Sequence, residues 1–159
     1  MENLKFTKAT IKDLDLVYEF MLNQADDERK YLNDIDKKKR KDLFYTKSEI
    51  KNILLSPNSH MLIAKIGNTP IGCGLAKIER ASKWNKYAKQ GYLGMLYIKK
   101  SYRKKGIAQK LQEARINWLK SKGINFITSW VLYNNKPAIH LIMKRGFKPR
   151  LIQFYKELK

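Results

Sequence analysis

The start of the chain shows two hydrophobic periods in succession. The stretch LKFT at residues 4–7 alternates apolar and polar side chains, which predicts a short strand. Thr10 and Asp13 have the spacing of a loose capping box, in which each residue's side chain bonds the backbone of the other at a helix start. The helix that follows has one apolar face, made by Leu14, Val17, Tyr18 and Met21. A strand followed by an amphipathic helix is therefore expected.

A second amphipathic helix is expected after a charged segment. Residues 24–45 carry many charges, and their pattern fits either a solvated helix or a loop. Thr46 and Glu49 form a better capping box. The apolar positions after it are Ile50, Ile53 and Leu54. The sequence SPN at 56–58 ends this helix.

The middle of the chain has the period and composition of a β-sheet. HMLIAKI at 60–66 and PIGCGLAKIERA at 70–81 flank a turn at 67–70, and together they predict a hairpin. The polar and aromatic loop SKWNKYAKQ at 82–90 follows. YLGMLYI at 92–98 then predicts a third strand of the same sheet.

Helices and strands alternate in the last third of the chain. An apolar stripe predicts a helix over 106–122, with Gly123 placed as its C-terminal cap. NFITSWVLY at 125–133 predicts a strand, and Asn135 begins another helix. LIQFYKEL at 151–158 predicts the last strand. The expected order is β-α-α-β-β-β-α-β-α-β, which is that of an α/β (α+β) protein.

The composition is that of one globular domain, which we place over residues 1–159. The hydrophobic fraction of 43% argues against a disordered chain. Cys73 is the single cysteine, which excludes an internal disulfide and suits a reducing compartment. The N-terminus lacks the apolar core of a signal peptide, and no apolar run has membrane-spanning length. We therefore expect a cytoplasmic protein without a membrane segment.

Positive charge is concentrated in the last two thirds of the chain. The formal net charge is +20, and residues 1–50, with 11 acidic and 11 basic residues, contribute none of it. Residues 51–159 hold 23 basic residues and three acidic ones, Glu79, Glu113 and Glu157. This distribution favours an anionic partner there, such as a nucleotide, a nucleic acid or an acidic lipid. A compositional bias toward lysine would give the same excess.

The segment SYRKKGIAQKL at 101–111 has the features of a phosphate site. Arg103, Lys104 and Lys105 stand just before Gly106, at the start of an expected helix. The first N–H groups of a helix have no partner inside it, and they carry the positive end of its dipole. Glycine lets a ligand approach the backbone closely, and the cations add to its attraction for an anion. A solvated, charged helix start is the alternative.

Two short sequence signatures stand in order, about 30 residues apart. Arg103–Ala108 matches R/Q-x-x-G-x-G/A between a strand and a long helix. Asn135 and Ala138, followed by Gly146–Phe147, match the second signature. In both respects the chain resembles the GNAT superfamily of acetyl-coenzyme A-dependent N-acetyltransferases, best over residues 60–148. The resemblance implies a mixed, mostly antiparallel central sheet flanked by helices, with a splayed strand pair that holds the cofactor.

The resemblance also implies acetyl-coenzyme A (acetyl-CoA) as the co-substrate, with no metal, and it assigns residues to that molecule. The pyrophosphate would be held by the turn that consists of Arg103, Lys104, Lys105, Gly106, Ile107, Ala108 and Gln109. The strand before this turn would splay from its neighbour, so that Leu96, Tyr97 and Ile98 pair with the pantetheine arm. The side chain of Asn135 would contact the same arm, and it also fits a plain helix cap.

Acetyl transfer from a thioester to an amine needs a neutral amine, a stabilised oxyanion and a protonated leaving thiolate. Backbone N–H groups near Leu96 would stabilise the oxyanion. The strand lacks the glutamate that many relatives carry, so Glu79 is the candidate base, with a water relay as the alternative. Ile142 stands where many relatives carry a tyrosine acid, which leaves Tyr133 or Tyr155 as the candidate acid.

Three functions fit these observations. The first is an N-acetyltransferase, monomeric or homodimeric, that acts on a primary amine of a small molecule or a protein. The second is a nucleic-acid- or ribosome-directed member, favoured by the net charge and by Trp84, Tyr87 and Tyr92. The third binds acetyl-CoA without catalysis, favoured by Ile142. Acids suited to a cationic amine, opposed by the basic run at 37–41, are Asp26, Asp27, Glu28, Asp34 and Asp36.

Overall fold

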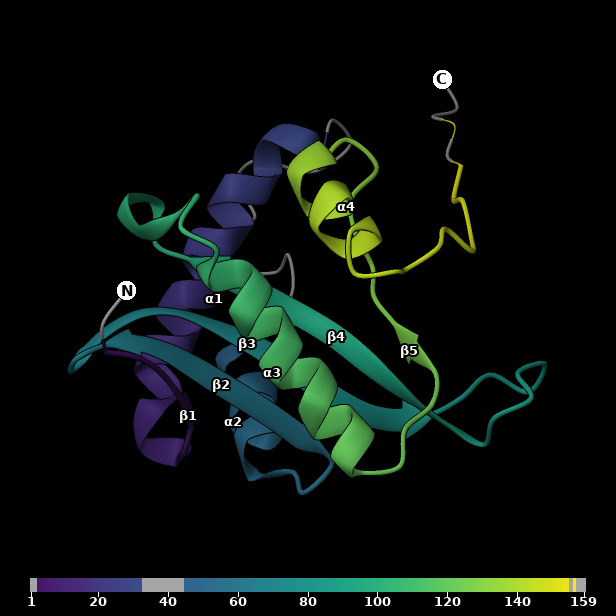
Figure 1. The fold of residues 1–159 in the computed structure, drawn as a ribbon, viewed down its shortest axis with the longest axis horizontal. Helices are drawn as coiled ribbons and strands as arrows, with labels where there is room; N and C mark the ends of the chain where they lie inside the picture. The colour runs from purple at the N-terminus through teal and green to yellow at the C-terminus, as the bar shows by residue number, and fades with distance from the viewer. Residues whose placement is uncertain (1–2, 33–44, 155, 157–159) are drawn as a thin grey trace.

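A five-stranded sheet forms the centre of the computed structural model, which describes residues 3–32, 45–154 and 156 (Figure 1). The strands, in their order across the sheet, are β1 (Leu4–Lys8), β2 (Ser59–Ile66), β3 (Thr69–Arg80), β4 (Lys89–Ile98) and β5 (Ile127–Thr128). The pairs β1–β2, β2–β3 and β3–β4 are antiparallel, whereas β4 and β5 run parallel. The mixed, mostly antiparallel sheet predicted from the sequence is confirmed.

Helices lie on both faces of this sheet. They are α1 (Leu14–Glu28), α2 (Lys47–Leu55), α3 (Ile107–Ser121) and α4 (Lys136–Met143), and short 3-10 turns lie at Ile11–Asp13, Arg29–Tyr31 and Lys100–Tyr102. In Figure 1, α3 crosses the front of the sheet, and α1 and α2 lie behind it. Within the ambiguous segment 24–45, α1 continues to Glu28, and 33–44 lies outside the described residues. Among the described helices, none is both long and apolar enough to cross a membrane.

The period-two pattern of the strands explains how one sheet packs against helices on two faces. On β2, Met61 and Ile63 pack into the cluster that contains the apolar faces of α1 and α2. Leu62 and Ala64, the alternating residues, pack into a cluster with Ile107 and other residues of α3. Burial of each of the larger side chains, Met61, Leu62 and Ile63, stabilises the fold by about 1.5–3 kcal/mol. The two cores hold α1 and α3 on opposite sides of β4.

The helix ends follow the local signals of the sequence. Thr46 N donates to Glu49 Oε2 at 2.7 Å, and Glu49 N donates to Thr46 Oγ1 at 3.2 Å, so this capping box is formed. Thr10 N donates to Asp13 Oδ2 at 2.8 Å, ahead of the 3-10 turn that leads into α1. Gly123, with φ of +73°, ends α3 in the left-handed conformation expected of a glycine cap.

The strands expected near the C-terminus are shorter than the sequence predicts. The prediction of a strand over 125–133 was wrong in length, because the ladder with β4 is confined to Gly91 and Tyr92. Among the described residues no further strand pairs with β5 on its other side, so nothing extends it. The strand predicted over 151–158 is not formed by Leu151–Phe154, which is exposed, and most of the remainder lies outside the described residues.

Candidate active site

β4 and β5 pair only at the start of β4, which leaves the second half of β4 open. The ladder includes Gly91 and Tyr92, and Ser129 Oγ donates to Leu93 O at 2.8 Å just beyond it. From Gly94 to Ile98, β4 has no strand partner on this side within the described part of the chain. This arrangement agrees with the splayed strand pair that the family resemblance implied, and it leaves this half of β4 without a strand neighbour on that side among the described residues.

A bulge in the open half of β4 is held by a buried arginine. Gly94 and Met95 stand together opposite Leu75 of β3, one residue more than a regular ladder allows. Arg115 of α3 is 1% exposed, and its Nη1 donates to the carbonyl oxygens of Leu75, Gly94 and Met95 at 2.9, 3.2 and 3.0 Å. A Cβ at Gly74 would lie 3.0 Å from Arg115 Cδ, so this glycine makes room for the arginine.

Burial lowers the pKa of Arg115 but does not remove its charge. It lowers the pKa of Arg115 to about 10, which still leaves the guanidinium charged at neutral pH. Arg115 Nη2 also donates to Gln112 Oε1, within α3. A buried cation therefore binds the carbonyl oxygens on one side of the bulge, and it fixes the path of the strand toward Leu96.

The turn before α3 has the geometry of an anion site. Gly106 is the N-cap residue of α3, with φ of +73°, and nothing lies within 4 Å of the position that a Cβ would take. Lys104 is also left-handed, with φ of 61°. Arg103, Lys104 and Lys105 are exposed around the first N–H groups of α3, which have no acceptor inside the helix. An anionic group such as a pyrophosphate fits this turn.

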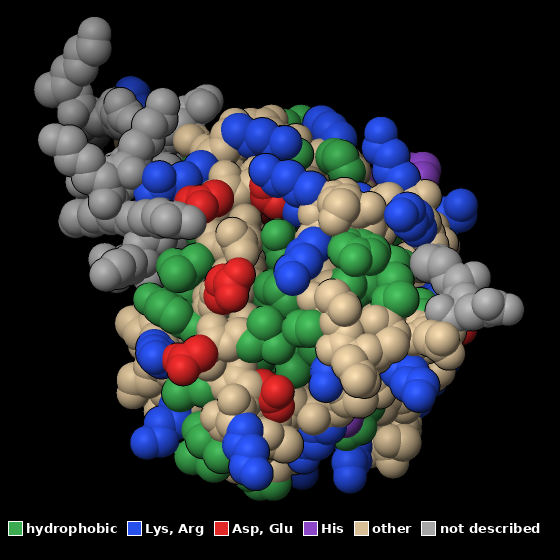
Figure 2. All heavy atoms as spheres, turned by 90° about the vertical axis from the view of Figure 1, so that its left-hand side faces the viewer, with side chains coloured by type: hydrophobic (Ala, Val, Ile, Leu, Met, Phe, Trp, Pro, Cys, Tyr) green, Lys and Arg blue, Asp and Glu red, His purple; other side chains and the backbone are tan. Residues whose placement is uncertain are grey.

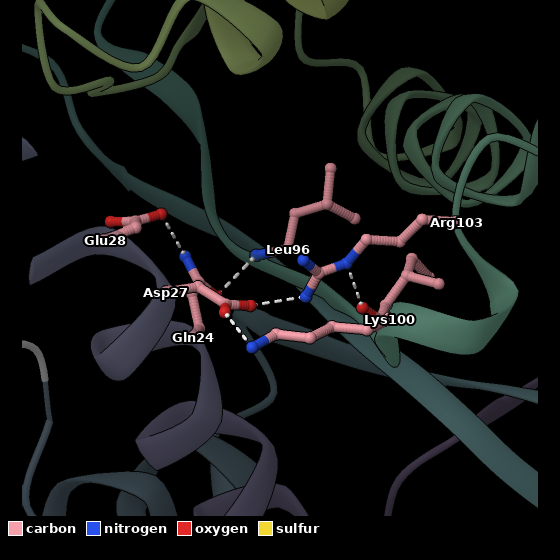
Figure 3. Close-up of polar contacts among 7 residues, drawn as sticks. Gln24, Asp27, Glu28, Leu96, Lys100 and Arg103 are labelled. Atoms are coloured by element: carbon pink, nitrogen blue, oxygen red, sulfur yellow. Dashed lines mark hydrogen bonds and ion pairs between the residues drawn. The ribbon is translucent and has the colours of Figure 1, made fainter. Parts of the chain in front are cut away.

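Arg103 links the turn to α1. Its guanidinium forms an ion pair with Asp27, and its Nε donates to Ile98 O at 2.7 Å (Figure 3). Lys100 Nζ lies 3.3 Å from the Asp27 carboxylate. Burial on its own raises the pKa of Asp27, but the hydrogen bonds and charges of Arg103 and Lys100 outweigh it and hold this pKa below its usual value. The C-terminal end of α1 is thus bound to the anion turn by charge.

A second polar chain links α1 to the open half of β4. The backbone N–H of Leu96 donates to Gln24 Oε1 at 3.1 Å, and Gln24 Nε2 donates to Glu28 Oε1 at 3.0 Å (Figure 3). Burial is the main reason that the pKa of Glu28 is raised; the bond from Gln24 lowers it, and neighbouring Asp27 raises it. The sequence placed Glu28 among acids suited to an amine, but it gave no signal for Gln24.

Glu79, the predicted base, lies near the end of the β3–β4 ladder that is remote from Leu96. Glu79 is exposed and accepts a hydrogen bond from Gln90 Nε2 at 2.9 Å. Gln90, its partner in the ladder, precedes Leu96 by six residues, which is roughly 17–20 Å along the strand. Tyr133 is 76% exposed, in the segment between β5 and α4. Tyr155 lies outside the described residues. The roles given to these residues stay predictions.

The second sequence signature lies at α4. Asn135 Oδ1 accepts from Ala138 N at 3.3 Å, which confirms the helix cap, and its contact with pantetheine stays a prediction. Ile142, the residue at the usual tyrosine position, is partly buried in α4. Arg145 Nη2 donates to Gln109 O at 3.1 Å and so ties the end of α4 to the first turn of α3.

These features coincide with a known protein family. The model of the acetyltransferase (GNAT) family matches residues 21–147, which include the second half of α1, strands β2 to β5, the anion turn and α4. The chain belongs to this family. The description of this family is that of acetyltransferases, and acetyl-CoA is the co-substrate of the family. Among the described residues, no group of three or more His, Cys, Asp or Glu side chains is placed to hold a metal ion.

One curated relative and several solved structures extend the comparison. N-alpha-acetyltransferase 30 of Saccharomyces cerevisiae is 31% identical over 90 residues, which are 55% of this chain and 49% of the yeast protein. The chain thus spans about half the length of this curated relative. A mutant of the BH1408 protein from Bacillus halodurans superimposes with a TM-score of 0.82, at 17% identity, over 98% of this chain and 99% of that one.

Two further structures share the fold and contain the coenzyme. A predicted acetyltransferase from Clostridium acetobutylicum, solved with acetyl-CoA, has a TM-score of 0.74 and 23% identity over 98% of this chain and 96% of its own. The aminoglycoside N-acetyltransferase AAC(6')-Iy, solved with CoA, has a TM-score of 0.71 and 16% identity over 97% and 94%. At these identities, the likeness shows a common fold.

Proposed function

We propose that this GNAT protein transfers the acetyl group of acetyl-CoA to a primary amine of a small molecule or a protein. The observation that carries the proposal is the joining of two features by Arg103: a half of β4 that has no strand neighbour on one side among the described residues, and an anion turn at the start of α3. The turn around Gly106 would hold the pyrophosphate, and the backbone of Leu96, Tyr97 and Ile98 would pair with the pantetheine arm. Bound acetyl-CoA supplies an activated acetyl group and a thiol leaving group.

The backbone of β4 supports the chemistry without a special side chain. The Leu96 N–H points away from β3, since it donates to a side chain of α1. A thioester carbonyl beside it would have a preorganised donor for the negative charge that develops on its oxygen. The hydrogen bonds from Arg115 hold the bulge just before Leu96. The Leu96 N–H is therefore already oriented before the reaction, and little free energy is needed to align it with the developing charge.

The surroundings of this N–H favour a cationic acceptor. Asp27 and Glu28 of α1 lie beside the open half of β4, and acidic side chains attract amines that are protonated in solution. Figure 2 shows that the acidic side chains on one face gather to one side, and that Lys and Arg surround much of the face. An amine would approach near Asp27 and Glu28, and the phosphates of the co-substrate would lie at the turn around Gly106.

The names of the similar proteins suggest which amines to test. The yeast relative is an N-alpha-acetyltransferase, and two structural neighbours are aminoglycoside acetyltransferases. We therefore include peptides with a free α-amine and aminoglycosides in an acceptor panel, together with polyamines, amino acids and tRNA.

The experiment measures thiol release from acetyl-CoA in the presence of each acceptor, and mass spectrometry identifies the acetylated product. We expect one class of primary amine to raise thiol release clearly above the hydrolysis seen without acceptor. Release with tRNA alone would favour the nucleic-acid-directed function. If calorimetry shows acetyl-CoA binding but no acceptor releases thiol, the protein binds the co-substrate without catalysis and the proposal fails.

A further inference from the structure

We propose that Glu28 is the base that receives the amine proton, and that Gln24 holds Glu28 and the Leu96 N–H until acetyl-CoA displaces it. This inference rests on the proposed function and names the residues of α1 that serve it. Gln24, Glu28 and Leu96 form one continuous hydrogen-bonded chain across the gap between α1 and β4 (Figure 3).

The Gln24 amide makes two bonds at once, and both matter. Its oxygen accepts a hydrogen bond from the Leu96 N–H at 3.1 Å. This amide oxygen therefore occupies the position that the carbonyl oxygen of a bound thioester would take. Its nitrogen donates to Glu28 Oε1 at 3.0 Å. One amide group therefore separates the Glu28 carboxylate from the donor at the reacting carbonyl. An amine that attacks this carbonyl enters the same space, within direct or one-water reach of Glu28.

Two cations at the end of α1 pair with a different acid from Glu28. Asp27, next to it on α1, is paired with Lys100 and Arg103, so these two cations are bound by Asp27. From β4, Tyr92 faces the same region: burial, then the charges of Glu79 and Glu28, raise the pKa of its hydroxyl, which stays neutral. The raised pKa of Glu28 makes it a stronger base than an exposed glutamate.

Glu79 is the competing candidate, and its place in the sheet differs. It lies near the end of β3, exposed, where Gln90 bonds its carboxylate. Glu28 instead connects through a single side chain to the N–H group on which the reaction would centre. We therefore assign the proton transfer to α1 rather than to β3.

The protons and electrons of the step balance as follows. A protonated amine gives its first proton to Glu28, which later passes it to solvent. The nitrogen lone pair forms a bond to the acetyl carbon, and the C–S bond breaks with its electron pair on sulfur. The second nitrogen proton ends on sulfur, so that an amide, a thiol and one released proton are the products.

The first test follows the Glu28 carboxyl itself, by NMR titration of glutamate side chains, with the Glu28→Gln variant to assign the signal. We expect the pKa of Glu28 to lie above about 4.3, the value of an unperturbed glutamate. Added acetyl-CoA should raise this pKa further, because the Gln24 bond that lowers it is lost. In Gln24→Ala, the pKa should already be raised, and acetyl-CoA should change it little. A Glu28 pKa that responds to neither change overturns the proposal.

The second test compares pH–rate profiles, with the primary amine that the acceptor panel returns. Glu28→Gln should lower kcat/KM by about 10²–10⁴-fold and remove the acidic limb of the profile, as expected for loss of a general base. Glu19→Gln, an exposed position of α1, is the matched control and should leave the profile unchanged. Acetyl-CoA affinity and melting temperature should be unchanged in Glu28→Gln.

The competing variant is Glu79→Gln. If it removes the acidic limb while Glu28→Gln retains it, the base lies on β3 and the proposal is wrong. If the panel returns no acceptor, the proposed function fails, whereas the NMR titration still decides whether acetyl-CoA displaces Gln24 from Glu28. The two failures are thus distinguishable.

Discussion

At the scale of single residues, Gly106 is the position where a substitution tests the co-substrate site most directly. Its φ of +73° and the open space at its Cα are what close approach of a phosphate to the backbone requires. We expect Gly106→Glu to abolish acetyl-CoA binding in calorimetry, because the added carboxylate would stand where the pyrophosphate belongs. The fold should persist, since no atom lies within 4 Å of the new Cβ.

Gly123 offers a matched control at the other end of α3. It has the same φ of +73° and the same open surroundings. A side chain in this conformation costs about 1–2 kcal/mol at either position, so both variants should lose similar stability. Only Gly106→Glu should lose acetyl-CoA binding. Binding as tight as in the wild-type protein would show that the turn does not hold the phosphates.

At the scale of elements, the bulge in β4 depends on α3 through one buried side chain. Arg115 Nη1 satisfies three carbonyl oxygens, and Arg115 is the largest of the fully buried side chains among the described residues. A cation buried in this way is an unusual feature in an apolar core, because its desolvation is costly. Its hydrogen bonds offset that cost and hold two neighbouring residues of β4 out of the regular ladder.

Arg115→Met tests this dependence. The methionine fills much of the same volume but leaves the carbonyl oxygens of Leu75, Gly94 and Met95 without their donor. We expect the free energy of unfolding in urea to fall by roughly 1–3 kcal/mol, the cost of leaving a buried polar group without its hydrogen-bond partner. The NMR signal of the Leu96 N–H should shift, and acetyl-CoA affinity should fall. Unchanged stability and an unchanged Leu96 signal would show that the bulge forms without the arginine.

The elements that the sequence predicted well are those whose signals are local. The capping box of Thr46 with Glu49, the glycine cap at Gly123 and the alternation in β2 to β4 all depend on residues near one another in the chain. The strand over 125–133 has the right residue types, but a ladder also needs a partner, and β4 offers one only at Gly91 and Tyr92. No local pattern encodes that limit.

In the candidate site, too, the sequence predicted the features that depend on neighbouring residues and missed those that depend on distant ones. The turn at Arg103–Ala108 could be predicted because its cations, its glycine and its helix start are contiguous. The chain from Gln24 to Leu96 joins residues 72 apart, and the bond from Arg115 to Leu75 joins residues 40 apart. A glutamine on α1 and an arginine on α3 look like ordinary helix residues until the fold brings them to β4. Their roles therefore needed the structure.

At the scale of the whole molecule, the net charge of +20 is balanced by few acids outside the first third of the chain. At α1, Asp15 pairs with Lys47, and Asp27 pairs with Arg103 and Lys100; a further ion pair of the described residues joins Arg145 to Glu113. Much of the remaining surface carries lysines without an acidic neighbour in the sequence. Repulsion among like charges destabilises a compact state, so salt should stabilise this protein.

Screening gives this expectation a direction and a size. Raising NaCl from about 10 mM to about 100 mM shortens the screening length from roughly 30 Å to roughly 10 Å, which weakens repulsion more than contacts between paired groups. We expect the melting temperature to rise by roughly 2–4 °C, the shift that about 1 kcal/mol produces in a chain of this size.

Sodium sulfate at equal ionic strength is the control. An equal rise in melting temperature indicates screening. A larger rise indicates that sulfate acts beyond screening, either as a ligand of the anion turn or by exclusion from the protein surface. The Gly106→Glu variant separates these two causes, because it should lose only the part due to binding. A melting temperature that falls with salt would mean that the ion pairs of α1 outweigh the repulsion of the lysines.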